Sequence, residues 1–402
     1  MAIEKISGVY LDEEVDYELS GTGGKIPVVI GLTNNSGTAE YKVDGTTVLK
    51  FTGYDDLNKP ISAGGIGAVV PGVQSNNILN LVLRKFYEEA RLKKPDDIGI
   101  PYIYVIDVGD GTSRDAWLNA LETALIKNDA DVLAFIGTEN ITYTPAGETD
   151  PVSYSVVDLM KATRAALETK THTFELFNTF FTKKDGTDAE LIALTNADTG
   201  IQKSRVGIIE WDKFNVGKSI ARVCLTPYNT EVGFIPYRSV EPGEFPERTG
   251  AEKLALQKAG IIFNHDEIVN DKINPRMNRC VATSYAADNR PADARFHARF
   301  IVDEVLKQIY EVAYPFIKAN DTATNLVKLQ VKVDTVVDTF IRAEECIAWN
   351  KDTEKGTKLI VQESSEEPYD MEIVGPVQPV NAIDAIMVRE KINTAALYNG
   401  GS

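Results

Sequence analysis

The middle of the chain alternates between two hydrophobic patterns, one typical of buried strands and one typical of amphipathic helices. Near-continuous apolar runs at 100–111 and 131–138 are typical of strands buried on both faces of a parallel sheet. The segment between them, 112–129, repeats apolar residues at helical intervals, namely Trp117, Leu118, Leu121 and Leu125. This order predicts a βαβ unit and therefore an α/β core.

Further elements extend from this unit in both directions. Residues 25–72 are predicted to form short strands and turns, and 73–94 a helix that ends before Pro95. After the unit, the pattern predicts helices at 155–182, 216–227, 294–321 and 325–350, and strands at 205–211, 359–363, 371–380 and 383–392. Long amphipathic helices dominate after about residue 280, which predicts a second unit of α+β character.

The first strand-like run, ISGVYLDEEV at 6–15, has no local partner. The Gly-rich segment 20–24 separates it from the next apolar run at 25–33. A strand leaves backbone N–H and C=O groups unpaired until it joins a sheet, so this run must find an edge elsewhere. Pairing within its own domain and pairing with another molecule both remain open on this evidence.

Size and composition are those of a soluble folded protein with more than one packed unit. The chain has 402 residues, of which 43% are hydrophobic and 25% are charged, and such lengths usually divide into two or three units. No apolar run reaches the roughly 18 residues of a membrane span. The N-terminal segment lacks the basic and apolar regions of a secretory signal, so we expect synthesis in the cytoplasm.

Charge and ligand types exclude two broad classes of function. Lys and Arg total 42 and Asp and Glu total 59, which gives a net charge of −17. A nucleic-acid binder usually presents a basic patch, whereas the clearest clusters here are acidic, at 11–19 and 363–372. The cysteines Cys224, Cys280 and Cys346 and the three histidines are scattered, so we expect reduced thiols and no zinc site.

Two short motifs resemble catalytic sequences, and neither is complete. GKS at 217–219 ends like a phosphate-binding loop, but Asp212 takes the place of the motif's first glycine. We expect a helix start there, with Lys218 in solvent. GTS at 111–113 resembles the nucleophile turn of subtilisin-like proteases, but no histidine lies in a matching setting. We expect a helix capped by Thr112 or Ser113.

A third cluster, FNHDE at 263–267, is also weak as a site. Adjacent residues on a strand point to opposite faces, so His265, Asp266 and Glu267 do not converge there. No motif places two acids as a catalytic couple. We therefore expect no catalytic residues, no cofactor and no metal site.

Several longer segments occur in a characteristic order. They are SGVYLDEEV, KIPVVIGLTNNSG, NILNLVLRKFYEEA with PYIYVIDVG, VGKSIARVCLTPYNTEVGFIPYRSV, EKLALQKAGIIFNHDE and RFIVDEVLKQIYEVAYPFI. In this order they resemble the contractile tail sheath proteins of phage tails, R-type bacteriocins and contractile injection systems. The first segment resembles the family's N-terminal arm, with Ser7 where proline is usual. A later one matches through Leu256, Ala259, Gly260 and Ile261.

The resemblance implies a fold of α/β and α+β class. It consists of a subtilisin-like α/β core domain and a C-terminal α+β sheath domain, with extended β-arms at both ends. The implied limits are 1–20 for the N-terminal arm, 21–97 for the N-terminal strands and helix, 98–280 for the core, 281–362 for the helical part of the sheath domain, and 363–402 for the linker and C-terminal arm. The segment 34–72 is short, so we expect little or no protruding domain.

The implied function is structural. Sheath subunits form hexameric rings that stack into a helical tube around an inner tail tube, with baseplate and tail terminator proteins at the ends. Rigid-body repacking of the subunits then drives the tube through a target envelope. The implied place of assembly is the host cytoplasm, and the product is a virion tail or a released particle, with no nucleic acid bound and no direct membrane insertion.

The resemblance also suggests which residues contact neighbours. Terminal arms would add strands to the sheets of adjacent subunits. The N-terminal arm residues are Ile6, Gly8, Val9, Tyr10, Leu11 and Val15, and the C-terminal ones are Ile383, Ala385, Ile386, Met387 and Val388. The basic residues Lys328, Lys332 and Arg342 are candidates for contact with the tube, and a solvated helix face is the alternative for them.

Two other classes of function remain as alternatives. One is a non-contractile polymeric surface protein, which would form flat sheets and normally carry an export signal. The other is an enzyme on the α/β core, either subtilisin-like or nucleotide-hydrolysing. An enzyme would lose turnover on Lys218→Ala or Ser113→Ala, whereas a sheath would depend on residues 1–20 for polymerisation.

Overall fold

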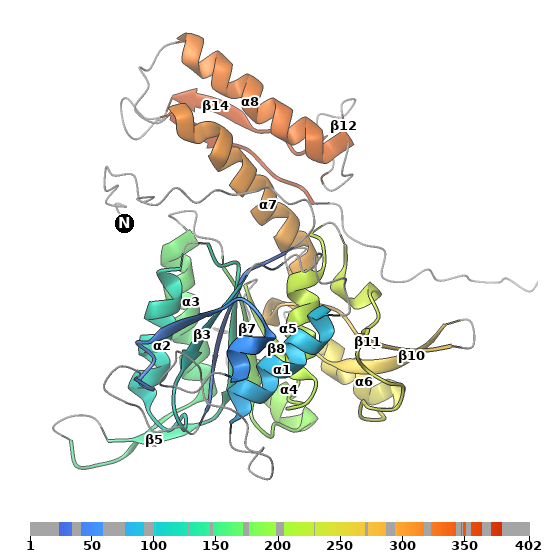
Figure 1. Ribbon diagram of the computed structural model, residues 1–402. Coiled ribbons are helices and arrows are strands. Elements are labelled where there is room, and N and C mark those ends of the chain that lie inside the picture. The colour runs from blue at the N-terminus through green and yellow to red at the C-terminus, as the bar shows by residue number, and fades with distance from the viewer. Residues whose placement is uncertain are drawn as a thin grey trace, which may run out of the picture.

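A computed structural model gives the fold of the chain. It describes residues 24–33, 42–58, 77–91, 100, 102–127, 129–144, 148–171, 177–197, 205–228, 230–269, 272–286, 294–316, 323–342, 347, 349–350, 355–363 and 371–379. An α/β body carries a smaller body made of helices and short strands (Figure 1). Among the described residues, no helix combines the length and the hydropathy that crossing a membrane requires.

A seven-stranded sheet forms the centre of the larger body, in the order β2-β3-β1-β4-β7-β8-β9. The strands are β1 Pro27–Gly31, β2 Val48–Phe51, β3 Ile103–Asp107, β4 Val132–Thr138, β7 Asn178–Lys183, β8 Val206–Ile209 and β9 Ile261–Ile262. Neighbours pair in parallel except β2 with β3. The buried strands predicted at 100–111, 131–138 and 205–211 are confirmed as β3, β4 and β8.

Helices cover both faces of this sheet. On one face, Trp117 packs on Phe135, whose ring stacks on Phe181 with 4.7 Å between centroids. Phe180, the residue before Phe181 on β7, points to the opposite face and packs on Phe296. The helices are α1 Ile78–Arg91, α2 Arg114–Leu125, α3 Val156–Thr171, α4 Asp188–Ala197, α5 Val216–Leu225, α6 Gly250–Lys258, α7 Phe296–Ala313 and α8 Ala323–Arg342.

The helix predicted at 155–182 is wrong in its second half. Helix α3 ends at Thr171, and the strand β7 begins at Asn178. The segment NTFFTK is rich in Thr and Phe, which favour strands. A strand points successive side chains to opposite faces, so Phe180 and Phe181 are both buried, one in each layer of helices.

The smaller body has its own hydrophobic cluster. Its buried members are Ile301, Val305, Ile309, Leu329, Val333, Val336, Val337, Phe340, Ile347 and Leu359. They come mainly from α7 and α8, which pack on the hairpin of β14 (Ile360–Glu363) and β15 (Met371–Val374). The short pair β12 (Trp349–Asn350) and β13 (Lys355–Gly356) belongs to the same region.

Helix α7 joins the two bodies because it contributes to both clusters. Phe296 and Phe300 lie in the larger cluster, and Ile301 begins the smaller one. Ion pairs link α7 to the central sheet. Asp303, 5% exposed, accepts hydrogen bonds from both terminal nitrogens of Arg205 and from Asn178, and Lys307 pairs with Asp131. The connection between the bodies is therefore a continuous helix packed at both ends.

Two further hairpins lie on the larger body. The first is β5 (Ile141–Tyr143) with β6 (Val152–Tyr154). The second is β10 (Asn264–Val269) with β11 (Lys272–Met277), which projects from the body as a two-stranded ribbon (Figure 1). Neither joins the central sheet.

Candidate functional site

One face of α8 carries the basic residues expected to contact a tube. At 3.6 residues per turn, positions 328, 332 and 342 fall on one side of the helix. Lys328 and Lys332 are exposed beside Val327 and Val331, which are 64% and 58% exposed. Arg342 is the last residue of α8. Lys328 and Lys332 thus lie on a face of α8 that combines positive charge with exposed apolar surface.

The hairpin β14–β15 has one covered edge. The side chain of Gln330 on α8 donates to the carbonyl of Leu359 and accepts from the N–H of Val361. Paired residues in an antiparallel ladder alternate between bonded and non-bonded pairs, so the pair Val361–Ile373 is a non-bonded one. The N–H and C=O of Ile373 then face the outer edge of β15. Among the residues that the structure describes, β14 is the one strand paired with β15, so the outer edge of β15 can accept another strand, whereas Gln330 covers the β14 side.

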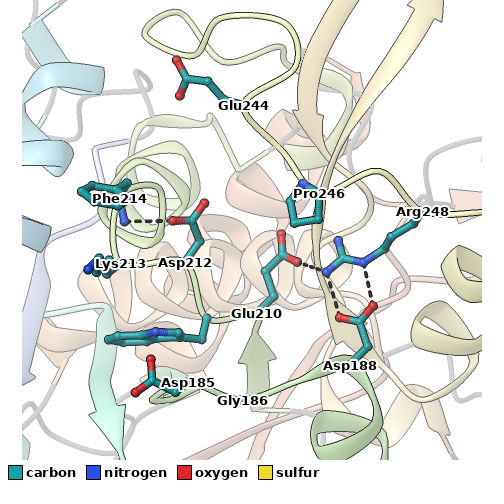
Figure 2. Close-up of a pocket in the computed structure, with 11 residues that line it drawn as sticks. Asp185, Gly186, Asp188, Glu210, Asp212, Lys213, Phe214, Glu244, Pro246 and Arg248 are labelled. Carbon is teal, nitrogen blue, oxygen red and sulfur yellow. Dashed lines mark hydrogen bonds and ion pairs between the residues drawn. The ribbon is translucent and has the colours of Figure 1, made fainter.

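A hollow of about 320 Å³ lies at the carboxyl ends of β7 and β8 (Figure 2). We call it the β7–β8 hollow. Ligands of parallel α/β sheets usually bind at such ends. Five acidic and two basic side chains line it together with apolar ones: Asp185, Gly186, Asp188, Glu210, Trp211, Asp212, Lys213, Phe214, Glu244, Pro246 and Arg248. The lining therefore carries an excess of negative charge.

Glu210 is the most buried charged group in this lining, at 4% exposed. Its carboxylate accepts from Arg248 at 2.7 Å and from the backbone N–H of Asn264 at 2.5 Å. Arg248 in turn makes two hydrogen bonds to Asp188, each 2.8 Å long (Figure 2). Burial raises the pKa of Glu210 to about 7, against the opposing effect of the Arg248 charge.

The GKS motif serves packing between helices and not phosphate binding. A Cβ at Gly217 would overlap the carbonyl oxygen of Val82, so glycine is required where α5 crosses α1. The expectation that Lys218 lies in solvent was wrong. Its ammonium group is buried, donates to the carbonyl of Ser239 at 2.8 Å and lies near Glu244. Lys218 therefore links α5 to the loop that contains Ser239, because that loop supplies the carbonyl.

The other two motifs also have structural roles. Ser113 is the N-cap of α2 and accepts from the N–H of Ala116, as expected for the GTS turn. His265 and Asp266 are adjacent on β10 and do not converge, and Asp266 accepts from the N–H of Gly243. Within the described residues, no group of three His, Cys, Asp or Glu side chains is placed to hold a metal ion.

The arm residues lie outside the described residues. This applies to Ile6, Gly8, Val9, Tyr10, Leu11 and Val15, and to Ile383, Ala385, Ile386, Met387 and Val388. The edge of β15 and the β7–β8 hollow were not predicted from sequence. An acid directly after the buried run RVGII, at Glu210, is the signal that could have indicated the hollow.

No protein-family model matches the chain, and no curated protein matches it.

Solved structures match over nearly the whole chain. The contracted helical sheath of the anti-feeding prophage aligns with a TM-score of 0.61 at 10% identity, covering 97% of this chain and 100% of that one. The chain has the fold of contractile sheath proteins. The contracted PVC sheath complex of an extracellular contractile injection system gives 0.59 at 11% identity, covering 98% and 100%. The sheath tail protein from Listeria innocua gives 0.53 at 9%, covering 88% and 95%.

The sheath fold confirms the resemblance seen in the sequence, at the level of architecture. Because the alignments cover both partners almost completely, this chain and those sheath chains have similar extents.

Proposed function

We propose that the chain is a structural subunit of a contractile tail sheath. The similarity to sheath chains over nearly the full length of both partners carries this proposal. The subunits form hexameric rings stacked into a helix around an inner tail tube, between baseplate and tail terminator proteins. Assembly takes place in the host cytoplasm, and contraction repacks subunits as rigid bodies to drive the tube through a target envelope.

The proposed division of the chain follows the sequence. The sequence-based limits are 21–97, then 98–280 for the core and 281–362 for the sheath domain. The core proposed here includes the described part of 21–97, because β1 and β2 are strands of the central sheet. Two separate hydrophobic clusters support a core and a C-terminal body. The largely parallel sheet with helices on both faces supports a subtilisin-like description of the core, which remains a proposal.

The terminal segments 1–20 and 363–402 are proposed to hold the lattice. Strand 6–15 or 383–392 of one subunit pairs with a neighbour by β-augmentation. The open edge of β15 is the proposed acceptor, because Gln330 covers the other side of the hairpin. Joints at Gly8 and 20–24 let subunits turn while strands stay paired. The acidic segment 363–372, expected from sequence to be a third joint, does not fit that role, because its ends Glu363 and Met371 are paired with each other in the β14–β15 hairpin.

The exposed face of α8 is proposed to contact the tube. Lys328, Lys332 and Arg342 would supply positive charge toward an acidic tube surface, and Val327 and Val331 would supply apolar contact. The proposal needs no cofactor.

Negative-stain electron microscopy of the full chain, with and without residues 1–20, tests this function. Hollow tubes or stacked rings that disappear on truncation are the expected result. Tubes that survive truncation would support the sheath function but would show that residues 1–20 do not hold the lattice together. A chain that forms neither tubes nor rings, even with a tube protein, would contradict the proposal. Protease and nucleotide-hydrolysis activities would then be assayed, since those are the alternative functions. Flat sheets would indicate a surface-layer polymer.

Proline at position 373 tests the acceptor edge. Ile373→Pro removes an N–H that faces the outer edge of β15, so the hairpin keeps its own ladder while an incoming strand loses a partner. Ile373→Ala loses similar packing but keeps the N–H. Loss of polymer in the proline variant alone supports this edge, and equal behaviour of the two variants excludes it.

A further inference from the structure

The N-terminal segment enters the fold at the joint between the two bodies. Lys25 and Ile26 stand directly before β1, and we call these two residues the root of that segment. Residues 1–23 lie outside the described residues. Lys25 is buried, and its backbone N–H donates to the carbonyl of Cys224 at 3.0 Å. The root is therefore held at a fixed place, beside the end of α5.

The ammonium group of Lys25 connects α5 with α7. It donates to the carbonyls of Val223 at 3.3 Å and Thr226 at 2.5 Å. Both lie at the carboxyl end of α5, where the last carbonyls have no partner within the helix and the dipole favours a cation. The same nitrogen lies 4.4 Å from the centre of the Phe300 ring on α7, which is a cation–π distance. One side chain of the root therefore bonds to α5 and contacts α7.

Ile26 reaches α7 at a second point, through Asp131. The N–H of Ile26 donates to one carboxylate oxygen of Asp131 at 2.9 Å, and the other oxygen pairs with Lys307 of α7. Lys307 lies about two helical turns beyond Phe300. A helix held at two points cannot pivot about either of them, so the root fixes the direction of α7 as well as its position.

The smaller body bears on the same end of α5. Tyr228 follows that end and packs on Phe340 of α8, with 5.8 Å between the ring centres. Tyr228 also packs against the hydrophobic clusters of both bodies. The root is therefore bonded to α5 where α5 meets the smaller body, and it contacts the helix that joins the two bodies.

We propose that the root braces the joint, so that it fixes the angle between the two bodies and transmits a pull on the N-terminal segment to both of them. This inference rests on the proposed function in taking a neighbouring subunit to pull on that segment. In a subunit with a free joint, such a pull would first bend the molecule about α7. In a braced subunit the pull moves both bodies together, and rigid-body movement is what contraction requires.

The distance between two spin labels, measured by pulsed electron resonance on the free full-length subunit, tests the brace. The labels are attached through Ile126→Cys on the larger body and Val327→Cys on the smaller one, both at exposed positions. Cys346→Ser removes one competing thiol. The other two, Cys224 and Cys280, are buried, and burial raises the pKa of both, so they stay unlabelled.

Lys25→Met is the decisive variant, because it keeps the size of the side chain beside Phe300 and removes its donors and charge. The expected distance distribution is at least about two-fold broader than that of the parent. Lys25→Arg retains donors and charge and should keep the parent's width. Lys258→Met, at an exposed lysine of α6, is the matched control and should also keep it. All samples are measured at pH 7, since burial lowers the pKa of Lys25 to about 8.

Two results overturn the inference: a methionine variant as narrow as the control, or an arginine variant as broad as the methionine variant. If Lys25→Met does not fold, Asp131→Asn decides. Asparagine keeps an acceptor for Ile26 and loses the charge that pairs with Lys307, so a broader distribution supports the brace and the parent's width contradicts it. Electron microscopy of the parent reads the proposed function separately, because the distance between the labels is measured without a tube.

Discussion

A buried carboxyl group can set the pH dependence of a whole domain, and Glu210 is placed to do so. It links β8, the loop that carries Arg248, and the first residue of β10. Because burial raises its pKa to about 7, the folded protein holds this proton more tightly than the unfolded chain does. Its contribution to stability is therefore fully present below about pH 4.5 and is lost as the pH rises to 7.

Glu210→Gln should remove this contribution. The free energy of unfolding of the parent should fall relative to that of the variant between pH 5 and pH 8, by on the order of 3 kcal/mol. Glutamine keeps one acceptor oxygen for Asn264 or Arg248, and Arg248 retains both of its bonds to Asp188, so the fold should persist. Chemical unfolding of both proteins at the two pH values measures the difference. A constant difference would show that Glu210 is ionised throughout.

A second constraint on a single residue is the need for glycine at position 217, where the backbones of α5 and α1 are in contact. Gly217→Ala should destabilise the protein by about 3 kcal/mol, because the added Cβ overlaps the carbonyl of Val82. Gly250→Ala, in the first turn of α6 with open space around it, is the matched control and should be neutral or stabilising. Thermal unfolding of the two variants tests this, and similar melting temperatures would contradict it.

Helix α7 is the element that couples the two bodies. Asp303→Ala would leave Arg205 without its carboxylate partner, so the expected loss is about 3–5 kcal/mol. Glu168→Ala removes an exposed ion pair with Arg164 on α3 and should cost less than about 1 kcal/mol. Hydrogen exchange should show faster exchange in α7 for the first variant only. Unchanged protection there would mean that apolar packing alone holds the helix.

Elements with strong local patterns were predictable from the sequence. The apolar run at 131–138 and the capped helix after Ser113 are found as β4 and α2. The strand at 178–183 was not predictable from the sequence. Its side chains alternate between two buried faces, and this alternation can be recognised only when both layers of helices are in place. The environment of Lys218 depends on a carbonyl from Ser239, which comes from a different part of the chain. Interactions between residues far apart in the sequence cannot be predicted from the local pattern of hydrophobic and polar residues.

The whole molecule should behave as one stiff unit, because α7 is shared by two cores. Spin labels at Ile126 on the α/β body and Val327 on α8, both exposed, should give the same distance distribution in the free and assembled protein. Pulsed electron resonance measures this distance. A second distance population on assembly would show that the bodies rotate about α7. The order of segments along the sequence indicated this architecture, whereas the contacts between copies depend on surfaces that only the folded molecule brings together.

The amide of Gln330 has a consequence for the fate of the newly made protein. It bonds the N–H of Val361 on β14 and the carbonyl of Leu359 just before that strand, much as a neighbouring strand would, and so it shields that side of the hairpin from other chains. Among the described strands, this leaves only the β15 side of the hairpin for strand addition, and an edge open on one side disfavours the open-ended stacking that leads to amyloid. One side chain thus contributes to protecting the hairpin from fibril formation.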